Sequence, residues 1–130
     1  EIKTAESRAL LPKQILLSEA ITQWSNVGSL VHALHSSDYE LLGRSLEDII
    51  IEPYRSQSIP NFDALKKISL QSAALGCTIS GSGPSVFSLC RGQKIATEIQ
   101  KTQAAFMKET DIEFETHVSK INTHGIKILS

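Results

Sequence analysis

Apolar residues recur at helical spacing along the first third of the chain. After Pro12, every third or fourth position carries an apolar side chain, namely Leu17, Ile21, Trp24, Val27, Val31 and Leu34. This spacing predicts one long amphipathic helix, because residues three and four apart share a helical face. Gly28 falls inside the pattern, where glycine costs about 1 kcal/mol of helix propensity and can allow a bend or a close contact.

A second helix is expected after Ser37. The run Ser37-Asp38-Tyr39-Glu40 predicts a capping box, in which the Ser37 hydroxyl accepts from the backbone N–H of Glu40 and Glu40 reaches back. The apolar positions of this helix would be Leu41, Leu42, Leu46, Ile49 and Ile50. Pro53 should stop it, because proline lacks the backbone donor and biases the preceding residue away from helical angles.

A third helix is expected after the polar loop that runs to Pro60. Asn61 can cap it, and Gly76 stands where a helix-terminating glycine belongs. Its apolar positions are Leu65, Ile68 and Leu75.

The pattern then changes to short segments of β-forming residues. Residues 77–80 and 86–90 predict two strands, joined by Gly81-Ser82-Gly83-Pro84. A fourth helix is predicted from about Gln93 to Glu109. Alternation predicts further strands at 114–121 and 126–129, separated by a turn at 122–125, and residues 1–4 could add another. This order predicts an α+β fold, with a small antiparallel sheet and helices packed on one face.

Composition narrows the functional classes. A chain of 130 residues fits one domain, and its net charge of -1 with mixed acids and bases makes nucleic acid an unexpected partner. No apolar run approaches the ~20 residues that span a bilayer, and no leader is evident, so we expect a cytoplasmic protein. Because no secretory signal is evident, Cys77 and Cys90 are expected to be reduced, partly buried thiols, with a disulfide as the alternative. Neither a CxxC motif nor a histidine cluster suggests a metal pair. The chain begins with Glu1, which suggests that a preceding portion is missing.

Two arginines and one glycine-rich turn are the candidate binding groups. Arg8 follows the possible first strand, and Arg55 stands in what is expected to be an irregular loop. Arginine presents a rigid fork that suits a carboxylate or phosphate, although either residue could simply be solvated or salt-bridged. The Gly81–Pro84 turn could offer consecutive N–H groups to an anion, or it could be a plain hairpin turn. We expect Gly81 and Gly83 to need the glycine backbone, since an alanine at either position, if its φ is positive, would strain the turn and crowd the cleft.

The remaining polar residues suggest no chemistry. The histidines lack partners at ligand or triad spacing, so we expect structural or exposed roles for His32, His35, His117 and His124. Glu47, Asp48 and Glu52 are interpreted as a solvated helix end. No metal site and no complete catalytic site can be assembled from the chain.

Three segments resemble the GHMP small-molecule kinases. Residues 76–87 match the third signature motif of that superfamily, G-x-x-x-S-G-S-G-P-[ST]-x-F. Thr4-Ala5-x-x-Arg8-x-x-Leu11-Pro12 and Glu52-Pro53-Tyr54-Arg55 look like the homoserine kinase versions of two other segments. The resemblance covers essentially all of residues 1–130 and implies a ferredoxin-like C-terminal domain.

The resemblance also implies roles for individual residues. Such enzymes transfer the γ-phosphoryl group of ATP to the hydroxyl of L-homoserine; by position, Arg8 and Arg55 would grip the α-carboxylate of the substrate and Thr4 would lie nearby. The loop residues Ser80, Gly81, Ser82 and Gly83 would line the cleft and support the nucleotide-phosphate loop. That loop, of the form Pro-x-x-x-Gly-Leu-Gly-Ser-Ser-Ala, is absent from this sequence, so ATP and Mg²⁺ would be bound mainly by an N-terminal domain.

The resemblance leaves several expectations and alternatives. The isolated chain is expected to be inactive, and a homodimer is expected only by analogy. The chain could instead derive from another GHMP kinase, or be a non-enzymatic ferredoxin-like binding module in which Gly81–Pro84 is merely a turn.

Overall fold

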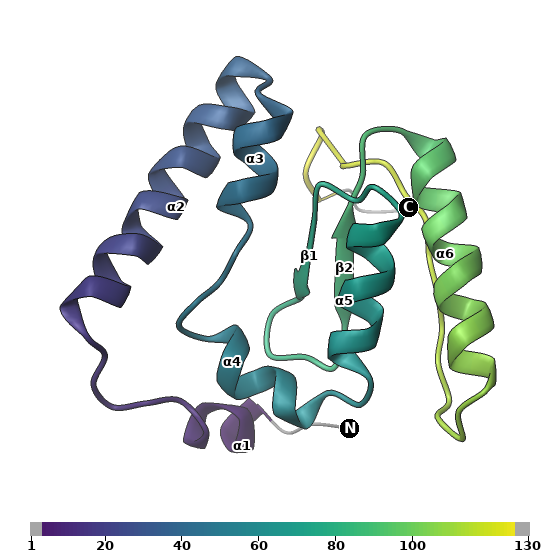
Figure 1. Cartoon of the computed structure of the whole chain (residues 1–130), viewed down its shortest axis with the longest axis horizontal. Coiled ribbons are helices and arrows are strands. Elements are labelled where there is room, and N and C mark those ends of the chain that lie inside the picture. The colour runs from purple at the N-terminus through teal and green to yellow at the C-terminus, as the bar shows by residue number, and fades with distance from the viewer. Residues whose placement is uncertain (1–3, 127–130) are drawn as a thin grey trace.

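The computed structural model describes residues 4–126 (Figure 1). In chain order, its elements are α1 (Thr4–Ala9), α2 (Leu17–Ser36), α3 (Tyr39–Ser45), α4 (Glu52–Arg55), the 3-10 turn η1 (Ser56–Ser58), α5 (Phe62–Gln71), β1 (Gly76–Ile79), β2 (Val86–Leu89) and α6 (Gln93–Lys108). No helix among the described residues is both long enough and apolar enough to cross a bilayer.

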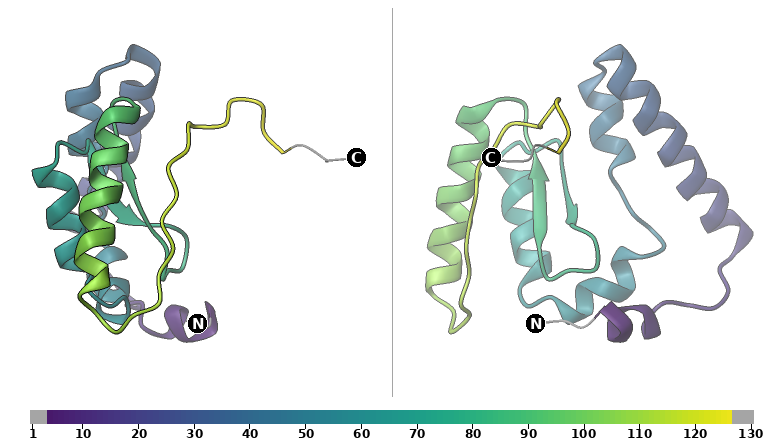
Figure 2. Two further views of the ribbon diagram at one scale, coloured as in Figure 1. Left: turned by 90° about the vertical axis from the view of Figure 1, so that its right-hand side faces the viewer. Right: turned by 180° about the vertical axis from the view of Figure 1, so that it is seen from behind.

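The two strands form an antiparallel hairpin. Gly76 pairs with Leu89 and Ile79 pairs with Val86. Helix α5 packs against both strands, and α6 packs against α5, so these helices lie on one side of the hairpin (Figure 2). The α+β class, the antiparallel hairpin and the helices on one face are therefore confirmed.

A buried hydroxyl joins α5, β2 and α6. The Ser69 side chain is fully buried; its Oγ donates to the backbone oxygen of Leu65 at 2.8 Å and lies 2.8 Å from the Ser88 Oγ. Gln103 Nε2 on α6 donates to the same Oγ at 2.8 Å. Because the buried Ser69 hydroxyl has hydrogen-bond partners, the contact fixes the packing without the penalty of an unsatisfied buried group. The buried apolar side chains of the described residues are Ala20, Ala33, Leu42, Ile59, Phe62, Cys77, Ile99 and Met107.

Helix α2 forms as expected, but its apolar stripe is exposed. The helix packs along α3 and buries only Ala20 and Ala33 (Figure 1). The exposed fraction is 64% for Trp24, and more than half for every other member of the stripe: Leu17, Ile21, Val27, Val31 and Leu34. Within the described residues, nothing covers this face.

The boundaries of α3 differ from the prediction. The N-cap is Asp38, whose carboxylate accepts from the backbone N–H of Leu41 at 2.9 Å, while Ser37 ends α2 with a left-handed φ of 57°. The predicted capping box at Ser37 is therefore wrong by one residue. Helix α3 also ends at Ser45, well before Pro53, which lies in the first turn of α4. Proline is tolerated there because the first helical N–H groups have no intrahelical acceptor.

The end of α5 also differs from the prediction. Asn61 is the N-cap residue, as expected, but it adopts a φ of 60° and its side chain makes no capping hydrogen bond. The helix stops at Gln71, and Ala73, with a φ of 63°, provides the left-handed residue. Gly76 does not end the helix; it is the first residue of β1.

The segment after α6 is extended but forms no ladder with any other described segment. Half-buried side chains alternate with exposed ones, the half-buried positions being Ile112, Phe114, Thr116 and Val118. Gln100 Nε2 on α6 donates to the backbone oxygen of Thr116 at 3.2 Å. The alternation was recognised correctly, but a strand at 114–121 is wrong. Residues 123–124 form a bend, across which Asn122 Nδ2 donates to the backbone oxygen of Gly125, whose φ is 69°. The expected strand at 126–129 falls almost entirely outside the described residues, as do residues 1–3 of the possible first strand, and Thr4 begins a helix.

Candidate functional site

The loop between β1 and β2 is a hairpin turn held by its own backbone. The N–H of Ser80 donates to the oxygen of Ser85 at 2.8 Å, and the N–H of Gly83 donates to the oxygen of Ser80 at 3.2 Å. Gly81 has a φ of 63° and Gly83 a φ of 82°, and the Gly83–Pro84 peptide bond is cis. Both glycines therefore have the positive φ on which the expected strain of an alanine depends.

These bonds limit what the loop can offer to an anion. The N–H groups of Ser80 and Gly83 are already used inside the hairpin, so the loop does not present an unbroken row of free donors. The Ser82 hydroxyl lies 3.5 Å from the oxygen of Gly83. Ser80, Gly81, Pro84 and Ser85 are exposed, whereas Ser82 and Gly83 are half-buried. The loop lies at the end of the hairpin that is near α4 (Figure 1).

Arg55 reaches this loop from α4. Its Nη1 donates to the backbone oxygen of Gly81 at 2.7 Å. Its Nε is buried and has no hydrogen-bond partner among the described residues. Arg55 lies in the last turn of a short helix, so the expectation of an irregular loop is wrong. A guanidinium whose Nη1 is held by a backbone oxygen can still donate to an anionic ligand from its other terminal nitrogen.

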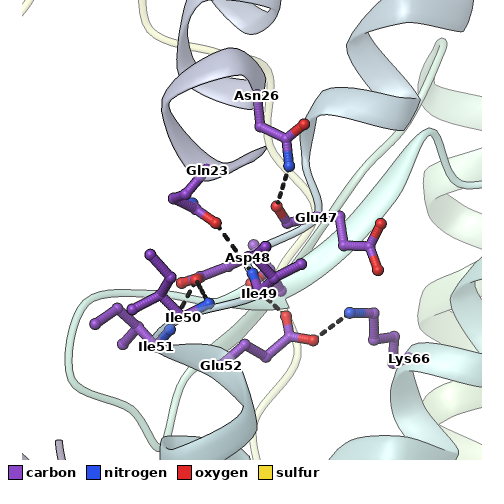
Figure 3. Close-up of polar contacts among 10 residues, drawn as sticks. Gln23, Asn26, Glu47, Asp48, Ile49, Ile50, Ile51, Glu52 and Lys66 are labelled. Carbon is purple, nitrogen blue, oxygen red and sulfur yellow. Dashed lines mark hydrogen bonds and ion pairs between the residues drawn. The ribbon is translucent and has the colours of Figure 1, made fainter. Parts of the chain in front are cut away.

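Glu52 forms a buried polar cluster three residues before Arg55. Its carboxylate pairs with Lys66 Nζ from α5 (Figure 3), and it accepts from the Thr78 hydroxyl of β1 at 2.6 Å. The exposed fraction of Glu52 is 9%. The interpretation of Glu52 as part of a solvated helix end is therefore wrong; a carboxylate loses its water here because a cation and a hydroxyl replace it.

Side-chain caps hold the segment that leads into α4. Asp48 Oδ1 accepts from the backbone N–H groups of Ile50 at 3.0 Å and Ile51 at 2.8 Å (Figure 3). The same segment is attached to α2, since Gln23 Oε1 accepts from the N–H of Ile49 at 3.0 Å. Asn26 Nδ2 likewise donates to the oxygen of Glu47 at 3.0 Å. Asp48 thus has a local structural role, and these bonds define where α4 starts.

Among the described residues, Arg8 forms no hydrogen bond or ion pair with this cluster. Arg8 is exposed in the last turn of α1, and its backbone oxygen accepts from the N–H of Leu11 at 3.2 Å. It lies in a helix rather than after a strand. Thr4 is the first residue of α1, and its side chain is outside what the structure describes. Helix α1 lies at the same end of the molecule as α4 and the hairpin loop (Figure 1).

The other titratable groups of residues 4–126 gather into no second site. All four histidines are exposed, as expected for residues without ligand or catalytic partners. Among residues 4–126, no three histidine, cysteine or acidic side chains gather as a metal site would require. Cys77 and Cys90 are free thiols. Burial, and secondly the neighbouring Cys77 thiol, raises the pKa of Cys90 above its usual value.

The sequence could not reveal two features of this site. Glu52 carries no signal that distinguishes it from a surface acid, and its partners Lys66 and Thr78 are 14 and 26 residues away. The contact between Arg55 and Gly81 also spans 26 residues. Only the resemblance of both segments to one enzyme family placed them together.

Comparison with known proteins gives consistent matches. The family model described as GHMP kinases C terminal matches residues 30–106. The homoserine kinases of Chlorobaculum tepidum and Chloroherpeton thalassium are each 42% identical, over 100% and 99% of this chain. The crystal structure of homoserine kinase from Cytophaga hutchinsonii is 48% identical and superposes with a TM-score of 0.84 over 87% of this chain. This chain covers only 41% of the two sequence relatives and 36% of the crystallised one.

Proposed function

This chain belongs to the GHMP kinase C-terminal domain family, and from that premise we propose that residues 1–130 form the substrate-binding domain of a homoserine kinase. The complete enzyme would transfer the γ-phosphoryl group of ATP to the side-chain hydroxyl of L-homoserine, and so serve threonine biosynthesis. The names of the relatives support this acceptor, and the position of Arg55 is the observation that carries it.

Arg55 is proposed to bind the α-carboxylate of homoserine. Its contact with Gly81 fixes one end of the guanidinium and leaves the opposite edge for a ligand. Arg55 is half-buried, and the proposed carboxylate would accept from its second terminal nitrogen, because the buried Nε is closed to a ligand. Arg8 is proposed to contribute a second donor and Thr4 to lie near the same carboxylate, both on the resemblance alone. Ser80, Gly81, Ser82 and Gly83 would then form the wall beside the substrate.

The described residues do not fit a complete nucleotide site. They include no cluster of acids for Mg²⁺, and the sequence has no Gly-Leu-Gly-Ser-Ser segment for the phosphates. Phosphoryl transfer depends on positioning and on neutralising charge with metal and loop donors. ATP and Mg²⁺ are therefore assigned to an N-terminal domain of the complete enzyme, and the catalytic residues with them. A cytoplasmic location and a homodimer are proposed with the same assignment.

The test is steady-state kinetics on a full-length protein that contains this chain. Arg55→Ala should raise the KM for homoserine roughly ten- to a hundredfold, since a charge-assisted hydrogen bond contributes about 1.5–3 kcal/mol, while the KM for ATP changes little. Arg55→Lys should restore little, because an ammonium group cannot reproduce the bidentate fork. The same comparison for Arg8→Ala tests the second donor.

The acceptor itself is tested with homoserine carboxamide. Wild-type enzyme should prefer the acid, and Arg55→Ala should lose most of that preference. A full-length enzyme that ignores homoserine but phosphorylates an acceptor without a carboxylate would favour another GHMP kinase. The isolated chain should release no ADP above a protein-free control, and clear turnover by it would refute the division of roles.

A further inference from the structure

Glu52 and Arg55 attach the same helix to the same hairpin. They lie three residues apart, so both side chains project from one face of α4. Glu52 accepts from Thr78 on β1, and Arg55 donates to Gly81 in the loop that follows β1. The two contacts therefore run side by side, three residues apart on each partner.

Helix α4 needs such contacts to hold its orientation. It has four residues, far fewer than the ~12–15 that an isolated helix requires to be even marginally stable in water. Its cap residue Ile51 makes no side-chain capping bond. The direction of the Arg55 side chain is consequently set by tertiary contacts, among which the Glu52 cluster is buried while the Arg55–Gly81 bond is exposed.

The Glu52 cluster also links α4 to α5. Lys66 comes from α5, so the carboxylate joins three elements: α4, α5 and β1. Lys66 is itself partly buried, and its alkyl chain places the ammonium 5.8 Å from the centre of the Phe62 ring. A rotation of α4 would separate the paired charges inside the protein, which is strongly unfavourable.

We propose that Glu52 is a positioning residue for Arg55: by holding α4 against β1 and α5, it keeps the guanidinium on Gly81 with its free edge toward the substrate carboxylate. This inference rests on the proposed function for its kinetic consequence but not for its structural one. Glu52 touches neither substrate nor nucleotide in this role. It acts through Arg55, on homoserine binding and not on phosphoryl transfer.

The structural consequence is tested on the isolated chain by ¹H–¹⁵N NMR of the arginine side chains. In the wild type, the Arg55 Nε–H should exchange slowly with water because it is buried. Glu52→Gln keeps an acceptor for Thr78 but removes the charge that pairs with Lys66, and it should accelerate that exchange at least tenfold. If the Arg55 Nε–H exchanged at the wild-type rate in both Glu52→Gln and Thr78→Val, the inference would be overturned. Thr78→Val removes only one hydrogen bond and serves if Glu52→Gln fails to fold.

The kinetic consequence is tested on the full-length enzyme. Glu52→Gln should raise the KM for homoserine about tenfold and weaken the preference for the acid over the carboxamide, with kcat and the KM for ATP within about twofold. The double variant Glu52→Gln/Arg55→Ala should be no worse than Arg55→Ala alone, because both act through one guanidinium. Additive effects would mean that Glu52 acts elsewhere.

Ser69→Ala is the matched control. It removes a buried polar group from α5, the helix that carries Lys66, but its partners are on β2 and α6 rather than α4. Ser69→Ala should lower the melting temperature without changing the KM for homoserine. If it raised that KM as much as Glu52→Gln does, the effect of Glu52 would be one of general stability and not of positioning Arg55. A wild-type enzyme inactive on homoserine would refute the proposed function while the NMR result still decided the positioning role.

Discussion

Replacing Gly83 by alanine should destabilise the protein through two separate effects. Its φ of 82° lies in the left-handed region, where a Cβ costs roughly 1–2 kcal/mol. The added Cβ would also lie 2.9 Å from Ile59 Cδ1 and 3.3 Å from Ile59 Cγ1. Ile59 is a core residue with 5% exposure and has little room to move, so overpacking should add roughly 1–3 kcal/mol. The expected total is about 2–5 kcal/mol.

Gly81→Ala is the internal control for this variant. Gly81 also has a positive φ, of 63°, but a Cβ there would meet nothing within 4 Å. It should therefore lose only the backbone contribution of roughly 1–2 kcal/mol. The sequence suggested that a Cβ at either glycine would crowd the cleft, whereas at Gly83 it would enter the core. Gly83→Ala should thus act mainly on folding.

Urea unfolding of the isolated chain, monitored by circular dichroism, gives the free energy of unfolding of each variant. The m-value should be the same for all variants, so that a lower midpoint means lower stability. Ile59→Val removes the Cδ1 atom that the new methyl group would contact, so Gly83→Ala should cost less in the Ile59→Val background than in wild type. The Gly81→Ala cost should be the same in both backgrounds. Equal costs for the two glycine variants, with no relief from Ile59→Val, would refute the assigned contact.

Three further predictions concern other parts of the chain. Gly28→Ala, inside α2 with open space around it, should stabilise the protein by about 0.5–1 kcal/mol in the same urea assay, and a loss of stability would reveal a contact there. Cys90 should react slowly with iodoacetamide at neutral pH because its pKa is raised, and Cys77→Ser should accelerate the reaction slightly. The fold favours the neutral Cys90 thiol, so Cys90 stabilises the folded state fully at pH values below the pKa of the unfolded thiol. This stabilisation is lost as the pH rises through the higher pKa of the folded thiol. Trp24, the only tryptophan, should show the emission of a water-exposed indole and be quenched by acrylamide, and a blue-shifted, protected emission would mean that α2 is covered.

The hairpin and α6 could be predicted because their signals are local. Residues 77–80 and 86–90 combine β-forming side chains with a Gly-Ser-Gly-Pro turn, and the two glycines permit the backbone angles that the turn requires. Helix α6 runs from Gln93 to Lys108, one residue short of the prediction. In both cases, the information that specifies the element lies within the element.

The failures occur where one residue is compatible with two structures. Pro53 can follow the end of a helix or occupy its first turn, and only the caps at Asp48 and the bonds from α2 select the second. The alternation at 112–118 describes which side chains are half-buried, but a strand also requires a neighbouring backbone. Similarly, periodicity identified α2 without showing whether its apolar stripe would be covered.

The two halves of the proposed reaction make different demands on a protein. A carboxylate needs a few fixed donors, which one arginine on a short, anchored helix can supply; phosphoryl transfer needs a metal, a phosphate loop and a nucleophile aligned with the leaving group. The first requirement fits Arg55, held by Gly81 and three residues from the buried Glu52. For the second, the described residues include no group of three histidine, cysteine or acidic side chains that could hold a metal, and the sequence has no Gly-Leu-Gly-Ser-Ser phosphate loop. Under the proposed function, substitutions around α4 should therefore change recognition of the acceptor more than the rate of the chemical step.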